Sequence, residues 1–322
     1  MGTAEQEKAF EKIAPFLSEQ RAAEEDVRRR AASFLPPDLS PRPPAPVGDI
    51  PYLRSNVFSI LFLAIYGGLG IEAPRRAFFG ALNHSIRGIV TATDNILDDE
   101  GKELLPLPLP SGANRFRSVM SALLYDRVID QLCDEHGPGK KPVFQKELAS
   151  ALYRIGEVEA EEECGLKHIA PAGEIVRRVH GRRGGNLLRL AFIGPLVYEE
   201  KGHGRIERAA EGVHSIGMAL QMMDDVVDLA EDARGMKNNY LLSRLLSEKV
   251  GHDIALGGWK ALAEVRPRLV TEAVEMAIGE ALDGFRRLNA VGFGLDDAAA
   301  MRFVATLFDL RGGADLLAMT RK

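Results

Sequence analysis

The sequence predicts an all-α fold, and three observations carry this prediction. Apolar residues recur with the period of amphipathic helices in segment after segment between glycine or proline breaks. No stretch shows sustained alternation of Val, Ile and Thr with polar residues between hairpin turns. Two acidic clusters, Thr93 to Glu100 and Gln221 to Asp232, lie inside apolar helical patterns. We therefore expect a helical bundle with a cavity between its helices.

The first 50 residues are expected to form an N-terminal helical segment followed by a proline-rich connector. Thr3 to Phe34 has helical spacing with a break near Pro15, and we expect it on the surface. Seven prolines fall between Pro36 and Pro51, which argues against regular helix and central strand there. The connector should be extended, and residues 51–322 should form one large helical domain.

The remaining helices follow in order along the chain. Asn56 to Ile71 is the most apolar run, but it contains three glycines and is shorter than the roughly 20 residues of a membrane span. It is interpreted as a buried helix, and the next helix covers Ala81 to Asp99. Further helices are expected at Phe116–Cys133, Val143–Glu163, Ala172–Val179, Asn186–Glu199, Arg205–Asp232, Asn239–Val250, Gly257–Val265, Arg268–Leu288 and Leu295–Leu310.

Charge and cysteine content narrow the class of protein. The net charge of −5 gives no reason to expect a nucleic-acid partner. Two cysteines, Cys133 and Cys164, supply neither a disulfide framework nor a metal-ligand pattern. Glu5, Glu7 and Glu11 interrupt any apolar stretch at the start, so we expect no signal peptide. A cytoplasmic protein without a transmembrane segment is the expectation that follows.

The second acidic cluster, QMMDDVVDLAED, indicates a metal site. On one helix over Val213 to Asp232, Gln221 and four aspartates share one side, and apolar residues take the rest. Such a helix is buried, and buried carboxylates are costly unless cations meet them. A solvated acidic face is the alternative, which the apolar flanks oppose. The four aspartates are Asp224, Asp225, Asp228 and Asp232.

The first acidic cluster contains a second pair of carboxylates, Asp94 and Asp98, spaced four residues apart on one helix face. The alternative is a polar helix end before Gly101, but acids at a helix C-terminus oppose the helix dipole. Mg²⁺ suits both clusters, because it is usually held by one or two carboxylates together with phosphate oxygens. No P-loop motif is present. Two facing groups of carboxylates with Mg²⁺ between them would hold a diphosphate.

The two clusters resemble the aspartate-rich motifs of class I isoprenoid synthases, a superfamily that includes polyprenyl diphosphate synthases, squalene and phytoene synthases and terpene cyclases. GMALQMMDDVVD resembles the second motif of polyprenyl synthases, where a glycine, a glutamine and DDxxD recur at this spacing. DNILD resembles the first motif, DDxxD, with Asn95 in place of its second aspartate. RRGGNLL puts Arg183 where the family has a diphosphate-binding lysine, and Lys237 matches a second such lysine.

The resemblance covers roughly residues 50 to 310. It implies an isoprenoid-synthase-type helical bundle around a central cavity and a Mg²⁺-dependent prenyltransferase that ionises an allylic isoprenoid diphosphate. Metals on the diphosphate would neutralise the charge that develops as the C–O bond breaks. The implied catalytic residues and metal ligands are Asp94, Asp98, Asp224, Asp225 and Asp228, with Asp232 as a further metal ligand. The implied substrate-binding residues are Arg183, Gln221, Lys237, Arg54, Arg87 and Arg117.

Two basic motifs of polyprenyl synthases are missing. PYLRS stands where the family has GGKRxRP, which binds isopentenyl diphosphate, and GKELLPLPLP replaces an Arg-Arg-Gly after the first motif. Few cations remain for that subsite, so we expect weak or absent use of isopentenyl diphosphate. DLAEDARG also resembles the DxxED stretch of squalene and phytoene synthases. Head-to-head coupling and a non-catalytic subunit of a prenyl synthase are therefore the alternatives, and a homodimer is a further open expectation.

Overall fold

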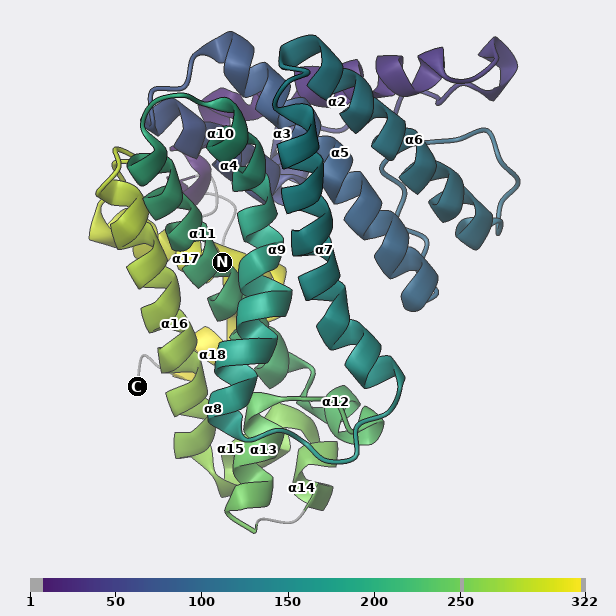
Figure 1. The fold of residues 1–322 in the computed structure, drawn as a ribbon. Helices are drawn as coiled ribbons and strands as arrows, with labels where there is room; N and C mark the ends of the chain where they lie inside the picture. Colours follow the sequence, from purple (N-terminus) through teal and green to yellow (C-terminus); the bar gives the residue numbers. More distant parts are fainter. Residues whose placement is uncertain (1–7, 250–251, 320–322) are drawn as a thin grey trace. The chain divides into compact units, whose positions relative to one another are not determined.

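The computed structural model describes residues 8–249 and 252–319, which form helices and turns without a strand (Figure 1). The all-α prediction is therefore confirmed for this part of the chain. The chain divides into two compact units. The α5 unit, named after α5 (Ala73–Leu97), contains Lys12–Glu147 and Leu190–His203. The α11 unit, named after α11 (His203–Val227), contains the described residues of Met1–Glu11, Leu148–Arg189 and Gly204–Lys322.

In the α5 unit, α2, α4 and α6 pack around α5. Helix α4 is apolar on nearly every side, which explains why it is buried among the others. A 3₁₀ turn precedes α2, at the break that was expected near Pro15. The elements of this unit are η1 (Ala14–Phe16), α2 (Leu17–Ser33), η2 (Pro37–Leu39), α3 (Asp49–Ser55), α4 (Val57–Gly68), α5, α6 (Asn114–His136), η4 (Leu190–Phe192) and α10 (Ile193–Tyr198).

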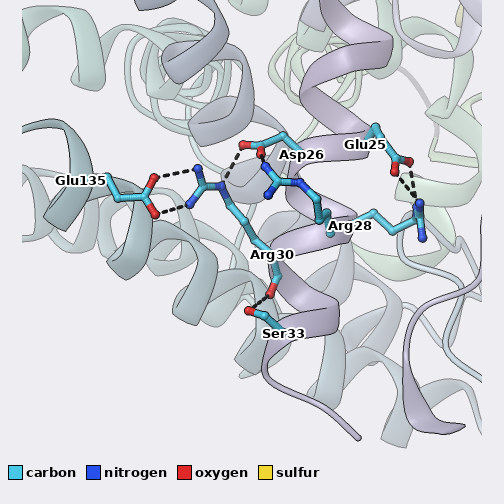
Figure 2. A network of polar contacts seen from close by, with 7 residues as sticks. Glu25, Asp26, Arg28, Arg30, Ser33 and Glu135 are labelled. Atoms are coloured by element: carbon cyan, nitrogen blue, oxygen red, sulfur yellow. Dashed lines mark hydrogen bonds and ion pairs between the residues drawn. The ribbon is translucent and has the colours of Figure 1, made fainter. Parts of the chain in front are cut away.

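Helix α2 was expected on the surface, and this is wrong for one of its faces. Val27 is fully buried there. Arg30 joins α2 to α6 through two hydrogen bonds of 2.7 Å to Glu135, and its Nε donates to Asp26 at 2.8 Å (Figure 2). The Arg30 side chain is only 12% exposed and that of Glu135 is 45% exposed, so this ion pair is partly shielded from water. The expected boundary at residue 50 falls inside the stretch Lys12–Glu147, and the division into an N-terminal segment of residues 1–50 and a helical domain of residues 51–322 stays a prediction.

The α11 unit differs from expectation at two places. The helix expected over Arg205–Asp232 ends at Val227, and a new helix begins at Leu229. Between them Asp228 leaves the helical path. A π-helix, η3 (Ile175–Gly185), also replaces the ordinary α-helix expected over Ala172–Val179. The other elements are α7 (Lys141–Glu163, which begins in the α5 unit), α8 (Ala172–Glu174), α9 (Asn186–Arg189), α12 (Leu229–Gly235), α13 (Tyr240–Ser247), α14 (His252–Leu256), α15 (Gly258–Val265), α16 (Pro267–Asn289), α17 (Asp297–Leu310) and α18 (Ala314–Met319).

Helices α11 and α16 run side by side in Figure 1, and glycines bring their backbones together. A Cβ added to Gly212 would lie 2.9 Å from the carbonyl oxygen of Gly284, closer than real Cβ atoms approach an oxygen. The contact therefore needs glycine on both helices. It holds α11 close to α16, and the second acidic cluster lies at the C-terminal end of α11.

No single helix in the described ranges is long and apolar enough to cross a membrane. Helices α3 and α4 pass such a test only when joined, and they are bent by 87° at Asn56. The apolar side chains of α4 are buried inside the α5 unit, including Ile60, Leu61 and Ile65. The prediction of a buried helix over Asn56 to Ile71 is therefore confirmed.

Candidate functional site

Three aspartates at the junction of α11 and α12 form what we call the acidic strip: Asp224, Asp228 and Asp232. The Asp224 side chain is 21% exposed, and its carboxylate lies 3.3 Å from Arg311. Burial is the main cause that raises the pKa of Asp224 to about 6; Asp228 and Asp225 add to it, and Arg311 opposes it. Burial also raises the pKa of Asp232 to about 6 and that of Asp228 above its usual value. Asp228 is exposed and its two neighbours in the strip are half-buried, so the strip gathers negative charge at the edge of the protein interior.

Asp225 makes different contacts from its neighbours in sequence. Its side chain is 5% exposed, and its Oδ2 accepts hydrogen bonds from His180 Nε2 at 2.8 Å and from the Tyr240 N–H at 2.6 Å. The backbone oxygen of Asp225 accepts from Asn239 Nδ2 at 2.6 Å, and the same amide group lies 2.9 Å from Asp232 Oδ2. Protein donors thus satisfy this buried carboxylate, and its expected role as a metal ligand stays a prediction.

The π-helix η3 turns its arginines toward α7. The N–H of Asn186 donates to the oxygen of Gly181, the wider spacing that defines a π-helix. Arg183 Nε lies 2.5 Å from Glu159 and its Nη1 lies 3.4 Å from Glu162. Burial acts to lower the pKa of Arg183, but Glu159, Glu162 and Asp232 outweigh it and raise that pKa. Arg183 therefore lies within the electric field of the acidic strip.

The opposite face of η3 meets α11 through glycines. A Cβ on Gly184 would overlap the carbonyl oxygen of Gly217, and a Cβ on Gly217 would overlap that of Gly184. The ring of His214 covers Gly185. The Cβ of Gln221 lies 2.9 Å from the position that a Cβ on Gly184 would occupy. This contact explains why RRGG and the glycine of the second motif occur together. Backbone contact also puts Gln221 beside η3, next to the strip.

Lys237 lies just beyond α12, on the same side of the chain as the strip. Its N–H donates to the backbone oxygen of Asp232 at 3.0 Å. Its positive charge opposes the rise in the pKa of Asp228 and of Asp232. Lys237 thus lies within electrostatic reach of the second motif, although no direct ion pair between it and these carboxylates is found among the described residues. Its expected role in binding diphosphate stays a prediction.

The first motif lies at the end of α5, in the other unit. Asp94 and Asp98 are exposed, and the N–H of Asp98 donates to the oxygen of Asp94 as the helix ends. Asn95 is buried and binds the backbone of Lys102 twice, with its Nδ2 donating to the oxygen at 2.7 Å and its Oδ1 accepting from the N–H at 3.0 Å. Asn95 thus folds the following segment back onto α5. Convergence of this motif with the acidic strip stays a prediction.

Replacing Asn95 by aspartate would restore the family's DDxxD pattern, yet we expect it to destabilise the protein by about 1 to 3 kcal/mol. The carboxylate would lose the donor that binds Lys102 and would face a carbonyl oxygen instead. Urea unfolding at neutral pH measures the change. Thr93→Ala, an exposed substitution two residues away, should alter stability by less than about 0.5 kcal/mol. A change in Asn95→Asp as small as that of the control would contradict the loop-anchoring role.

The arginines expected to bind a second substrate are held by protein groups. Arg87 donates to Asn56 Oδ1 at 2.5 Å and to the Ser55 oxygen at 3.0 Å, and burial lowers its pKa. Arg117 lies 3.0 Å from Glu103 and donates to the Pro110 oxygen at 3.1 Å. Arg54 is exposed. The first two cations therefore stabilise their own unit.

A cavity of about 440 Å³ lies beside Arg87 within the α5 unit. Three arginines line it, and so do three glutamates, which leaves the lining without net positive charge. Tyr52 and His84 also reach it, and burial is the main cause that lowers the pKa of His84 to about 3, so this ring is neutral at physiological pH. Such a lining does not favour a strongly anionic ligand.

The side chains of the site can be compared with the ligands that a divalent metal ion needs. Across residues 8–249 and 252–319 no group of three or more His, Cys, Asp or Glu side chains gathers around one point. Mg²⁺ does not require such a group, because it usually binds one or two carboxylates and completes its shell with water and phosphate oxygens. Asp224 and Asp228 offer hard oxygen ligands whose crowding a cation would relieve. The residues present therefore fit Mg²⁺ bound together with a phosphate ligand.

Sequence reasoning missed Arg311 and the pairing of His180. Arg311 follows α17 by one residue and contacts Asp224 from 87 positions away. Nothing in the sequence around His180 marks Asp225 as its partner, which lies 45 positions later. No local motif could have shown either contact.

Comparison with known proteins tests the fold. No family model and no curated protein matches the sequence. Solved structures do match, including a geranylgeranyl pyrophosphate synthetase from the archaeon Geoglobus acetivorans, with a TM-score of 0.61 and 13% identity over 100% of both chains. A geranylgeranyl pyrophosphate synthetase from Pyrococcus horikoshii gives 0.58 and 15%, over 97% of this chain and 98% of that one. A decaprenyl diphosphate synthase from Rhodobacter capsulatus gives 0.59 and 16%, over 97% and 99%.

All three neighbours are synthases of isoprenoid diphosphates, and the match with this chain covers almost the whole length of each. At such low identity they establish the fold, which is the one that the two aspartate-rich motifs imply. The chain therefore has the all-α fold of the class I isoprenoid synthases, in the form found in trans-polyprenyl diphosphate synthases.

Proposed function

We propose that this protein is a Mg²⁺-dependent prenyltransferase that ionises an allylic isoprenoid diphosphate. The observation that carries the proposal is the acidic strip, in which half-buried Asp224 and Asp232 flank exposed Asp228, with Arg183 in their field. Crowded carboxylates of this kind are favourable where cations bind between them. The fold shared with polyprenyl diphosphate synthases supports the same conclusion.

In this proposal Asp224 and Asp228 hold Mg²⁺, and Asp232 lies in reach as a further ligand. Bound Mg²⁺ would neutralise the charge that develops on the diphosphate as the allylic C–O bond breaks. Arg183 and Lys237 bind phosphate oxygens, with Gln221 beside them on α11. Asp94 and Asp98 supply the second pair of carboxylates from the end of α5. Asp225 serves the site from its buried position.

Contacts within the α5 unit support the proposal that the enzyme accepts few kinds of substrate. Arg87 and Arg117 are bound by protein acceptors, and the adjacent cavity carries equal numbers of arginines and glutamates. A second diphosphate would need several charge-assisted contacts. We therefore propose one or two allylic substrates bound through Mg²⁺, which includes head-to-head coupling. Asn95 anchors a loop, so its presence does not by itself favour a non-catalytic subunit. A cytoplasmic homodimer remains part of the proposal.

Incubation with geranyl, farnesyl and geranylgeranyl diphosphates tests this function, each with and without isopentenyl diphosphate and Mg²⁺. We expect Mg²⁺-dependent release of diphosphate from at least one allylic substrate, with little elongation. Mass spectrometry identifies the products. Rapid elongation at micromolar isopentenyl diphosphate would contradict the restricted choice of substrate. Release of no diphosphate from any substrate would favour a non-catalytic subunit.

A further inference from the structure

We propose that His180 is a positioning residue, whose hydrogen bond to Asp225 fixes Arg183 in η3 relative to the acidic strip on α11. The inference rests on the proposed function, because it concerns how the same diphosphate-binding site is held. In this proposal His180 binds neither the diphosphate nor Mg²⁺. It acts through Asp225 and through its own helix.

The His180–Asp225 contact is a shielded, charge-assisted hydrogen bond. The His180 ring is fully buried, and Nε2 lies 2.8 Å from Asp225 Oδ2. In this proposal Asp225 acts as the hydrogen-bond acceptor, so Nε2 carries the proton. A hydrogen bond to a charged group is stronger than a neutral one, and its directional geometry holds the ring in one orientation. This bond therefore joins η3 to α11 at a defined point.

The glycine contact between η3 and α11 cannot by itself hold the two helices at a defined point. Gly184 and Gly217 meet backbone to backbone, a surface without side chains of its own, and the His214 ring of α11 packs beside it against Gly185. Such a surface brings two helices close together but resists sliding or rotation poorly, because dispersion contacts have no strong direction. His180 stands four residues before Gly184 and supplies the directional contact. The glycines therefore set the distance between the helices, and the His180–Asp225 contact, together with the hydrogen bond between His214 and the Gly181 backbone, sets their register.

The register matters because the groups of the site adjoin this bond. Arg183 follows His180 by three residues on η3, and Asp224 precedes Asp225 on α11. Asn239 binds both the Asp225 backbone and Asp232 Oδ2, so the same anchor holds the far end of the strip. A shift at His180 would move the cation and the carboxylates relative to each other. Asp225 is thus a support for the site and is held by donors of the protein.

The decisive variant is His180→Phe, which keeps a ring of similar size and removes the donor. We expect inorganic pyrophosphate, titrated by calorimetry with millimolar Mg²⁺, to bind at least about tenfold more weakly than to the wild-type protein. His180→Gln, whose amide nitrogen can donate, should recover part of this affinity. Ser243→Ala is the matched control, because it removes a buried hydrogen bond of 2.7 Å to Ala170 in the same unit. It should lower the melting temperature and leave the affinity within about twofold.

Nitrogen NMR of histidine-labelled protein without metal gives a second readout that does not depend on binding. The His180 signals, assigned by their loss in His180→Gln, should show a proton on Nε2 and should shift in Asp225→Asn. A proton on Nδ1 alone would overturn the hydrogen bond and the inference with it. This measurement also stands if His180→Phe fails to fold, and His180→Gln then replaces it in the titration, with weaker binding expected.

The titration separates two kinds of failure. If the wild-type protein binds pyrophosphate with Mg²⁺ and the folded His180 variants bind it equally well, the positioning role is wrong and the proposed function survives. If Ser243→Ala weakens binding as much as His180→Phe does, the effect is only general loss of stability and the role is again wrong. If the wild-type protein does not bind pyrophosphate under any Mg²⁺ concentration tested, the proposed function and the positioning role fall together.

Discussion

Gly184→Ala is expected to lower the free energy of unfolding by about 3 kcal/mol or more, at the upper end of the cost of overpacking. The new Cβ would overlap the carbonyl oxygen of Gly217 and lie 2.9 Å from Gln221 Cβ. The carbonyl is backbone inside α11 and cannot rotate away, so the two helices must separate. Separation would also stretch the His180–Asp225 hydrogen bond. Urea unfolding followed by circular dichroism measures the loss.

Gly181→Ala is the matched control, because Gly181 lies in the same π-helix. No atom lies within 4 Å of the place where its Cβ would stand. We expect its stability to be unchanged or slightly raised, since alanine restricts the unfolded chain more than glycine does. Gly217→Ala should resemble Gly184→Ala. Equal stabilities of Gly184→Ala and Gly181→Ala would show that η3 and α11 are not in backbone contact.

Asp224→Asn is expected to stabilise the metal-free protein by about 1 to 2 kcal/mol at about pH 7.5 and to abolish most of its response to Mg²⁺ with pyrophosphate. Burial is the main cause that raises the pKa of Asp224 to about 6 in the folded protein. Folding therefore takes up protons, and the stability that this provides is complete below the pKa of the unfolded chain. It is lost as the pH rises through about 6. At about pH 7.5 the ionised carboxylate opposes folding, and the neutral amide does not.

Thermal unfolding at about pH 5 and pH 7.5, with and without Mg²⁺ and pyrophosphate, measures these effects. Asp224 and Asp232 should add to wild-type stability at the lower pH, because both have a raised pKa. The rise in melting temperature with Mg²⁺ should be larger at the higher pH, where protons no longer compete for the carboxylates. Asp283→Asn, an exposed substitution on α16, should change neither response. A full Mg²⁺ response in Asp224→Asn would exclude this carboxylate from the metal site.

Local pattern was sufficient for the fold class and for the position of most helices. The apolar flanks of the second cluster predicted a buried helix, and α11 is that helix up to Val227. The buried face of α2 was missed because alanines make up half of it, and their burial depends on packing against α5 and α6. Its anchor, Arg30, binds Glu135 across 105 positions of sequence. Such a contact is set by tertiary packing, and no local periodicity reports it.

The same distinction holds for the site. Spacing identified the aspartates of the acidic strip, because carboxylates in an apolar helical pattern are visible in the sequence alone. It could not separate Asp225 from Asp224, since the separation is made by His180 and Tyr240 from other elements. It also treated Asn95 as a departure from a motif, whereas the structure gives the amide two backbone contacts, one of which needs a donor that a carboxylate lacks. Local composition shows which groups are present, and tertiary contacts decide what each one does.

The π-helix has a consequence for how this chain is aligned with others. Each hydrogen bond in a π-helix encloses one more residue than in an α-helix. Ile175–Gly185 therefore has more residues per turn than an α-helix in the same place would have. A residue-by-residue pairing with any relative whose helix is α drifts out of phase inside this segment, without a loop to absorb the gap. Arg183 lies near its end. Its correspondence to a family position is therefore defined by superposed backbones and not by counting along the sequence.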